Sequence, residues 1–81
     1  MKITLICYAV LQETISDEPI LLEVPDSCNA EQVIEQLTQS YPQAVKILKS
    51  TRLAHQDDYI EKQSLLKEGE EYCLIPPVSG G

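Results

Sequence analysis

The chain has 81 residues, of which 43% are hydrophobic, and its 13 acidic against six basic side chains give a formal net charge of −7. This length allows one domain with a small core, and the apolar content is too high for a disordered chain. An acidic surface repels phosphate backbones, and no apolar run approaches the ~18 residues of a membrane span, so we expect neither nucleic acid nor a membrane as a partner. No signal peptide is recognised, and a cytoplasmic location is expected.

A first strand is predicted over residues 2–10, which are rich in β-branched and aromatic side chains. Because side chains alternate along a strand, the odd-numbered residues 3–9 share one face, and Ile6, Tyr8 and Val10 share the other. Both faces are apolar towards the end of this strand. A core explains one of them, whereas the other needs a covering element or a partner.

A polar and acidic segment, residues 12–18, is expected to form a loop. The short apolar run at residues 20–24 lies between Pro19 and Pro25 and predicts a second strand. This strand is expected to pair antiparallel with the first.

A helix is predicted to begin after Asn29, because Gln32 three residues later completes a capping-box pattern. The apolar stripe of this helix consists of Val33, Ile34, Leu37 and Tyr41. Pro42 ends the helix and is expected to start a second, shorter one.

Three further strands are predicted: two short ones at residues 52–55 and 58–60, around an Asp-rich turn, and a final one at residues 72–75. Leu65 and Leu66 are expected to fill the core ahead of the final strand. The first and last strands are the most hydrophobic, so we expect them to be central neighbours.

Such neighbours run parallel and are joined through the helix by a right-handed crossover. The sequence therefore predicts an α+β domain of the β-grasp, or ubiquitin-like, class, in which a mixed sheet packs on one main helix. A turn with positive φ is expected at Gly69. Residues 1–75 form the predicted domain, and residues 76–81 form a flexible, extended C-terminal Gly-Gly tail.

Few side chains offer catalytic chemistry. His55 is the only histidine, which excludes a histidine-based triad or a multi-histidine metal site, and no metal or bound cofactor is expected. Cys7, Cys28 and Cys73 are widely spaced and have no zinc-binding pattern. Cys28 stays open as a reactive thiol, although the neighbouring Asp26 would raise its pKa. The C-terminal tail is the remaining candidate.

The chain ends in Pro76, Pro77, Val78, Ser79, Gly80 and Gly81. The prolines end the last strand and favour an extended exit, and the glycines leave the tip without side chains. Such a tail suits a narrow pocket of another protein, where adenylation would give the terminal carboxylate a leaving group and a sulfur nucleophile would displace AMP. The alternative is a frayed terminus, against which the stiff proline stem argues.

This ending, together with residues 66–72 ahead of it (Leu-Lys-Glu-Gly-Glu-Glu-Tyr), resembles the small subunits of molybdopterin synthase among the MoaD/ThiS-like sulfur carriers. The resemblance covers the whole chain and is strongest over residues 65–81. Weaker matches lie at residues 8–13, where Gln12 replaces the usual arginine, and at residues 55–59.

The resemblance implies a β-grasp sulfur-carrier subunit of molybdenum cofactor biosynthesis. A ubiquitin-activating-like adenylyltransferase would use ATP to adenylate Gly81, and a sulfur donor protein would complete a thiocarboxylate (1-thioglycine) there. The tail would then enter the large synthase subunit, which supplies the catalytic pocket, and give sulfur to cyclic pyranopterin monophosphate to form the molybdopterin dithiolene. The family also implies a heterotetramer and partner contacts at Tyr8, Tyr59 and Ile75.

Three other functions stay open. The chain could be a ubiquitin-like modifier whose Gly81 is joined to lysines, or a sulfur carrier for thiamine synthesis or tRNA thiolation. It could also be an acidic interaction module with an inert tail. The Pro-Pro-Val-Ser signature favours the molybdopterin branch. The alternative for Tyr8 and Tyr59 is that they are ordinary half-buried strand aromatics.

Overall fold

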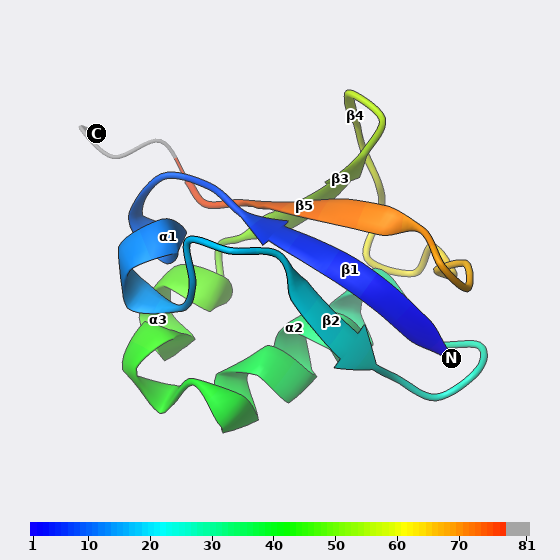
Figure 1. Cartoon of the computed structure of the whole chain (residues 1–81), viewed down its shortest axis with the longest axis horizontal. Coiled ribbons are helices and arrows are strands. Elements are labelled where there is room, and N and C mark those ends of the chain that lie inside the picture. The colour runs from blue at the N-terminus through cyan, green and yellow to red at the C-terminus, as the bar shows by residue number, and fades with distance from the viewer. Residues whose placement is uncertain (78–81) are drawn as a thin grey trace.

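The computed structural model describes residues 1–77 as a five-stranded mixed sheet with helices packed on one face (Figure 1). In chain order the elements are β1 (Lys2–Cys7), α1 (Val10–Thr14), β2 (Ile20–Glu23), α2 (Ala30–Ser40), the 3₁₀ turn η1 (Pro42–Ala44), α3 (Val45–Leu48), β3 (Arg52–His55), β4 (Asp58–Tyr59) and β5 (Glu71–Ile75). The strand order is β2-β1-β5-β3-β4. The central pair β1 and β5 is parallel, and the other neighbours are antiparallel. This is the predicted β-grasp arrangement.

The core lies between the sheet and the helices. From the strands it receives Ile3, Leu5, Cys7, Leu53, Tyr72 and Leu74, and from the helices Leu11, Ala30, Val33, Leu37, Ala44 and Leu48. Full burial of one large aliphatic side chain contributes ~1.5–3 kcal/mol, so these side chains dominate the stability of so small a domain. The alternation predicted for the first strand is confirmed up to Cys7.

The start of α2 is fixed by the predicted capping box. The Asn29 side chain accepts a hydrogen bond from the Gln32 backbone N–H at 2.8 Å, and the Gln32 side chain accepts one from the Asn29 N–H at 2.9 Å. Two of the N–H groups that a helix start leaves unpaired are thereby satisfied. Pro42 begins the 3₁₀ turn that leads into α3, in agreement with the predicted second short helix.

The end of the first strand is the main difference from the prediction. The strand stops at Cys7, the backbone of Ala9 takes a positive φ of 53°, and Val10–Thr14 forms α1 instead of the end of a strand followed by a loop. Leu11 explains this path, because the turn carries its side chain into the core, where it is fully buried. Burying the Leu11 side chain contributes ~1.5–3 kcal/mol, and an unfavourable backbone conformation at one residue costs ~1–3 kcal/mol. The two ranges overlap, so the burial of Leu11 offsets the cost at Ala9 and exceeds all of it only when the burial contributes about 3 kcal/mol.

The expected core role of the leucine pair is correct for one member only. Leu66 is buried, whereas Leu65 is 63% exposed. Residue 65 forms an isolated antiparallel bridge with Asn29, and the Leu66 N–H donates to the Cys28 carbonyl at 2.9 Å. The segment is therefore locally extended, and consecutive side chains of an extended chain point to opposite sides.

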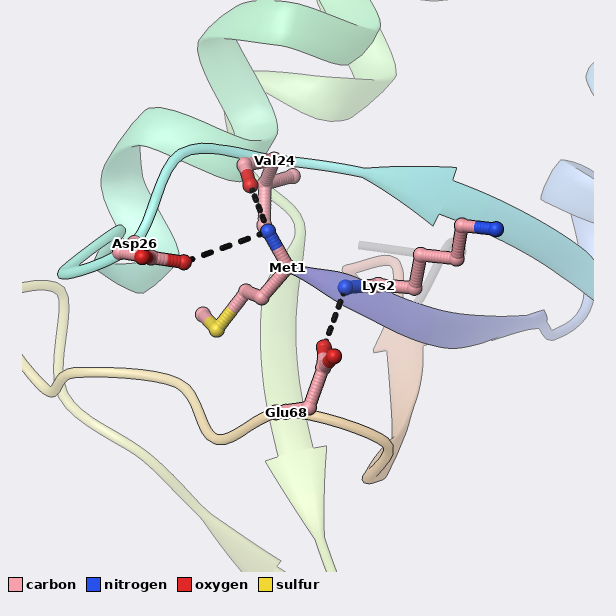
Figure 2. Close-up of polar contacts among 5 residues, drawn as sticks. All are labelled: Met1, Lys2, Val24, Asp26 and Glu68. Carbon is pink, nitrogen blue, oxygen red and sulfur yellow. Dashed lines mark hydrogen bonds and ion pairs between the residues drawn. The ribbon is translucent and has the colours of Figure 1, made fainter.

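The N-terminal end of β1 is held from two sides (Figure 2). The Met1 amine donates to the Val24 carbonyl at 2.6 Å and lies 3.4 Å from an oxygen of Asp26, and the Lys2 N–H donates to the Glu68 carboxylate. The Gly69 N–H donates to the Lys2 carbonyl at 2.7 Å, and Gly69 has the predicted positive φ, 78°. These contacts fix one end of the central strand pair, opposite the end where β5 passes into the tail (Figure 1).

Within residues 1–77, no helix is both long and apolar enough to cross a membrane.

Candidate functional site on the outer face of the sheet

The sheet face turned away from the helices carries a shallow hollow of about 260 Å³. We call it the outer hollow. Its lining consists of Tyr8, Ala54, Asp57, Tyr59, Cys73 and Ile75. The predicted partner contacts Tyr8, Tyr59 and Ile75 are all among these residues, although they come from three distant parts of the sequence.

Strand register explains why these side chains meet. Cys73 of β5 lies opposite Ile6 of β1 on one side and opposite Ala54 of β3 on the other, and Ala54 lies opposite Tyr59 of β4. Paired residues point to the same face, and the neighbouring residue Leu74 points into the core. The outward side chains therefore form a row across four strands.

Tyr8 lies at one side of the outer hollow, directly after β1, and is 45% exposed. Its hydroxyl oxygen accepts a weak hydrogen bond from the Cys73 thiol, with 3.8 Å between oxygen and sulfur. The neighbouring Cys73 sulfur, followed by the carboxylates of Glu71 and Asp57, disfavours a negative charge on the Tyr8 oxygen and so raises the pKa of the Tyr8 hydroxyl. Tyr8 therefore stays protonated at neutral pH and offers a flat apolar ring with a polar tip.

Tyr59 and Ile75 complete the apolar part of the outer hollow. Tyr59 is 55% exposed, and the guanidinium carbon of Arg52 lies 4.3 Å from the centre of its ring. Arg52 itself is paired with Ile75, the last residue of β5. An exposed aromatic pair on an otherwise apolar sheet face is typical of protein–protein contact surfaces. The contact roles of Tyr8, Tyr59 and Ile75 remain predictions.

The predicted tail begins at the edge of the outer hollow. Pro76, the residue after Ile75, is buried, and Pro77 is exposed. The predictions for Val78, Ser79, Gly80 and Gly81 lie outside the described residues. The structure therefore fixes the position of the chain as far as Pro77, two residues after the last strand, and the tail continues from there.

Two of the three thiols are built into the core rather than exposed for reaction. Cys7 and Cys28 are buried, and burial raises the pKa of both thiols. A thiol that stays protonated is a weak nucleophile, so the geometry argues against the reactive role considered for Cys28. Among residues 1–77, no three potential ligands gather into a metal-binding group.

His55 has a structural environment. Its Nε2 lies 2.8 Å from a carboxylate oxygen of Glu70, and its ring lies 5.0 Å from that of Tyr72. The Tyr72 hydroxyl in turn accepts a hydrogen bond from the Lys67 N–H at 2.9 Å. These contacts join β3 to the turn before β5 and present no nucleophile to a substrate.

The sequence prediction missed three residues of this face: Arg52, Asp57 and Cys73. Cys73 was recognised only as a small apolar strand residue, and Asp57 as part of a solvated turn. The available signal was strand alternation, which places Ala54, Cys73 and Ile75 on the face opposite the core once the sheet order is known.

Comparison with known proteins identifies the family of the chain. The family model described as "ThiS family" matches residues 7–81. Curated relatives named molybdopterin synthase sulfur carrier subunit include one from Dictyostelium discoideum, 31% identical over 95% of this chain and 93% of the relative. Another, from Drosophila melanogaster, is 30% identical over 100% of this chain and 92% of the relative.

Solved structures support the fold. The small archaeal modifier protein 1 of Haloferax volcanii superposes with a TM-score of 0.79 at 14% identity, covering 95% of this chain and 98% of that chain. A chain from the complex of subunits 1 and 2 of the molybdopterin-converting factor of Helicobacter pylori gives a TM-score of 0.65 at 22% identity, with both chains covered completely. At these identities the likeness shows a shared β-grasp fold and no more.

Proposed function

This chain belongs to the ThiS family, and we propose that it is the sulfur carrier subunit of a molybdopterin synthase. The observation that carries the proposal is the match to curated sulfur carrier subunits along essentially the whole chain, combined with a family match that extends to Gly81. The ending Pro-Pro-Val-Ser-Gly-Gly supports the molybdopterin branch of the family.

Gly81 is the reacting residue in this proposal. An activating enzyme joins its carboxylate to the AMP part of ATP and releases pyrophosphate, so that AMP becomes a good leaving group. A sulfur donor displaces AMP and leaves a thiocarboxylate. The thiocarboxylate sulfur bonds to a carbon of the pterin precursor and replaces an oxygen substituent, which leaves with a proton. Water then cleaves the new acyl–sulfur bond, so that the sulfur stays on the precursor and the carboxylate is restored. A second charged chain supplies the second sulfur of the dithiolene in the same way.

In these steps the folded domain provides the surface on which the partner proteins dock. The outer hollow supplies an apolar contact area with two exposed tyrosines, and the tail leaves β5 beside it. A partner that covers the outer hollow therefore receives the tail at a defined place. In this proposal the large synthase subunit provides the catalytic pocket, and the complex of subunits 1 and 2 of the Helicobacter pylori molybdopterin-converting factor supports an assembly of two different subunits. Neither a metal nor a cofactor held by this chain is required.

The test is the intact mass of the protein after incubation with ATP, its activating enzyme and a sulfur donor. We expect a gain equal to the replacement of one oxygen by sulfur, located at Gly81, and transfer of that sulfur to the pterin precursor when the large subunit is added. A variant extended by one alanine beyond Gly81 is the matched control, because it keeps the whole domain and lacks the terminal glycine carboxylate. Gain of sulfur by the extended variant would contradict the proposal.

The Gly-Gly ending on a β-grasp domain also suits a second function, that of a ubiquitin-like protein modifier whose Gly81 is joined to lysines, and the archaeal modifier protein is one modifier with this fold. In that case the same incubation, with cell extract as a source of acceptors, yields heavier products linked to lysines. An unchanged mass, with an activating enzyme that works on its own known carrier, would contradict both functions.

A further inference from the structure

A basic side chain lies next to the outer hollow. Arg52 is the only arginine of the chain. It is the first residue of β3, and its side chain is exposed. Its guanidinium stacks on the ring of Tyr59, with 4.3 Å from the guanidinium carbon to the ring centre. A cation is attracted to the face of an aromatic ring, so this contact holds the charge of Arg52 beside Tyr59.

Arg52 lies close to the outer hollow and to the point where the tail leaves β5. It is the register partner of Ile75, and Ile75 lines the outer hollow one residue before Pro76. Acidic groups also lie on this face: Asp57 lines the hollow, and the carboxylates of Asp57 and Glu71 act electrostatically on Tyr8. The surroundings of the outer hollow therefore carry acidic groups as well as Arg52.

The guanidinium has no counter-charge within residues 1–77, although the chain carries 13 acidic residues. The contact with the Tyr59 ring uses none of the N–H donors of the guanidinium, and the planar fork of these donors matches the two oxygens of a carboxylate. Covering the apolar outer hollow would take this charge out of water, which is costly unless the covering surface supplies an opposite charge.

We propose that Arg52 determines partner specificity by pairing with a carboxylate of the protein that docks on the outer hollow. The inference rests on the proposed function, so the partner is the large synthase subunit, and the paired group is an aspartate or glutamate at the edge of its docking surface. Because the chain has a net charge of −7, a generally acidic partner would be repelled. The required partner surface is therefore basic overall and carries one acidic residue opposite Arg52, and this combination excludes many wrong partners.

The test is calorimetric binding of the purified cognate large subunit to the full-length chain and three variants, Arg52→Lys, Arg52→Gln and Arg52→Glu. We expect Arg52→Gln to weaken binding by about tenfold, Arg52→Glu to weaken it by about a hundredfold, and Arg52→Lys to fall between Arg52→Gln and wild type, because lysine keeps the charge but not the planar fork. Lys46→Gln is the matched control: Lys46 is an exposed cation on α3, so its loss removes the same charge from the other side of the molecule.

A rescue experiment separates pairing from a structural effect. Each acidic residue of the large subunit is replaced by lysine in turn, and we expect one of these variants to bind Arg52→Glu at least tenfold more tightly than the unmodified large subunit does. Salt is expected to weaken binding of the wild type more steeply than binding of Arg52→Gln.

The outcomes distinguish the two proposals. If the wild type does not bind the large subunit, the proposed function fails and this inference fails with it. If the wild type binds and Arg52→Gln binds equally well, or no charge reversal rescues Arg52→Glu, the proposed function stands and the role of Arg52 is refuted.

Discussion

Tyr59 offers the sharpest test of the docking surface, because its side chain is half exposed in the free chain and lines the outer hollow. A fully buried aromatic side chain covers 150–250 Å², so docking would cover on the order of 100 Å² of additional Tyr59 surface. At ~25 cal/mol per Å² this corresponds to roughly 2.5 kcal/mol. Tyr59→Ala is therefore expected to weaken binding of the large subunit by roughly 50-fold.

The assay is isothermal calorimetry with the large subunit, accompanied by urea unfolding of each variant. Tyr59→Phe is expected to bind within a few-fold of the wild type, because it keeps the ring. Leu21→Ala is the matched control, since Leu21 is the most exposed of the large hydrophobic side chains, lies on edge strand β2 and is not part of the hollow. If Tyr59→Ala binds within threefold of the wild type, or Leu21→Ala loses as much affinity, the outer hollow is not the docking site.

Three further predictions concern the fold that presents this surface. Leu11→Ala is expected to reduce the free energy of unfolding by about 2–5 kcal/mol in urea titration. The control Val10→Ala, at an exposed position of the same helix, is expected to reduce it by less than about 1 kcal/mol. Equal losses for the two variants would contradict the explanation that burial of Leu11 causes α1 to form. Asn29→Ala is expected to cost ~1 kcal/mol through loss of the capping box, and Asn29→Ser should recover most of it. Burial raises the thiol pKa of Cys28 above its ordinary value of 9.0, so the unfolded chain releases this proton before the folded chain does as the pH rises. The free energy of unfolding should therefore fall above pH 9, and it should fall less steeply in Cys28→Ala. Urea unfolding at several pH values measures both.

The sheet and the main helix were predictable because local signals and tertiary packing agree there. Asn29 and Gln32 form the capping box that their spacing indicates, and the two most hydrophobic strands occupy the centre of the sheet. β1 and β5 are the central pair of the sheet and both supply several side chains to the core, which explains why they stand out by composition alone. Where several independent signals point to one structure, the sequence determines it well.

The region after β1 was not predictable for the opposite reason. Ala9 adopts a positive φ that its residue type disfavours, so no local preference marks the turn, and only the burial of Leu11 in the finished core explains it. Arg52 was missed in a similar way. Its place beside Tyr59 and Ile75 follows from the pairing of β3 with β4 and β5, and strand pairing is a long-range property that alternation alone does not reveal.

The same strand pairing sets a geometric limit on any partner. β5 ends at Ile75 in the outer hollow, Pro76 is buried, and four residues follow Pro77. An extended chain spans at most ~3.6 Å per residue, so the carboxylate of Gly81 reaches no farther than roughly 14 Å beyond Pro77. Each protein that reacts with Gly81 while bound to the outer hollow must therefore hold its reactive centre within that distance of the contact. An activating enzyme and a large subunit that both use Gly81 would then compete for the outer hollow, and Tyr59→Ala should weaken the binding of both; loss of binding to only one of them would show that the two partners dock on different surfaces.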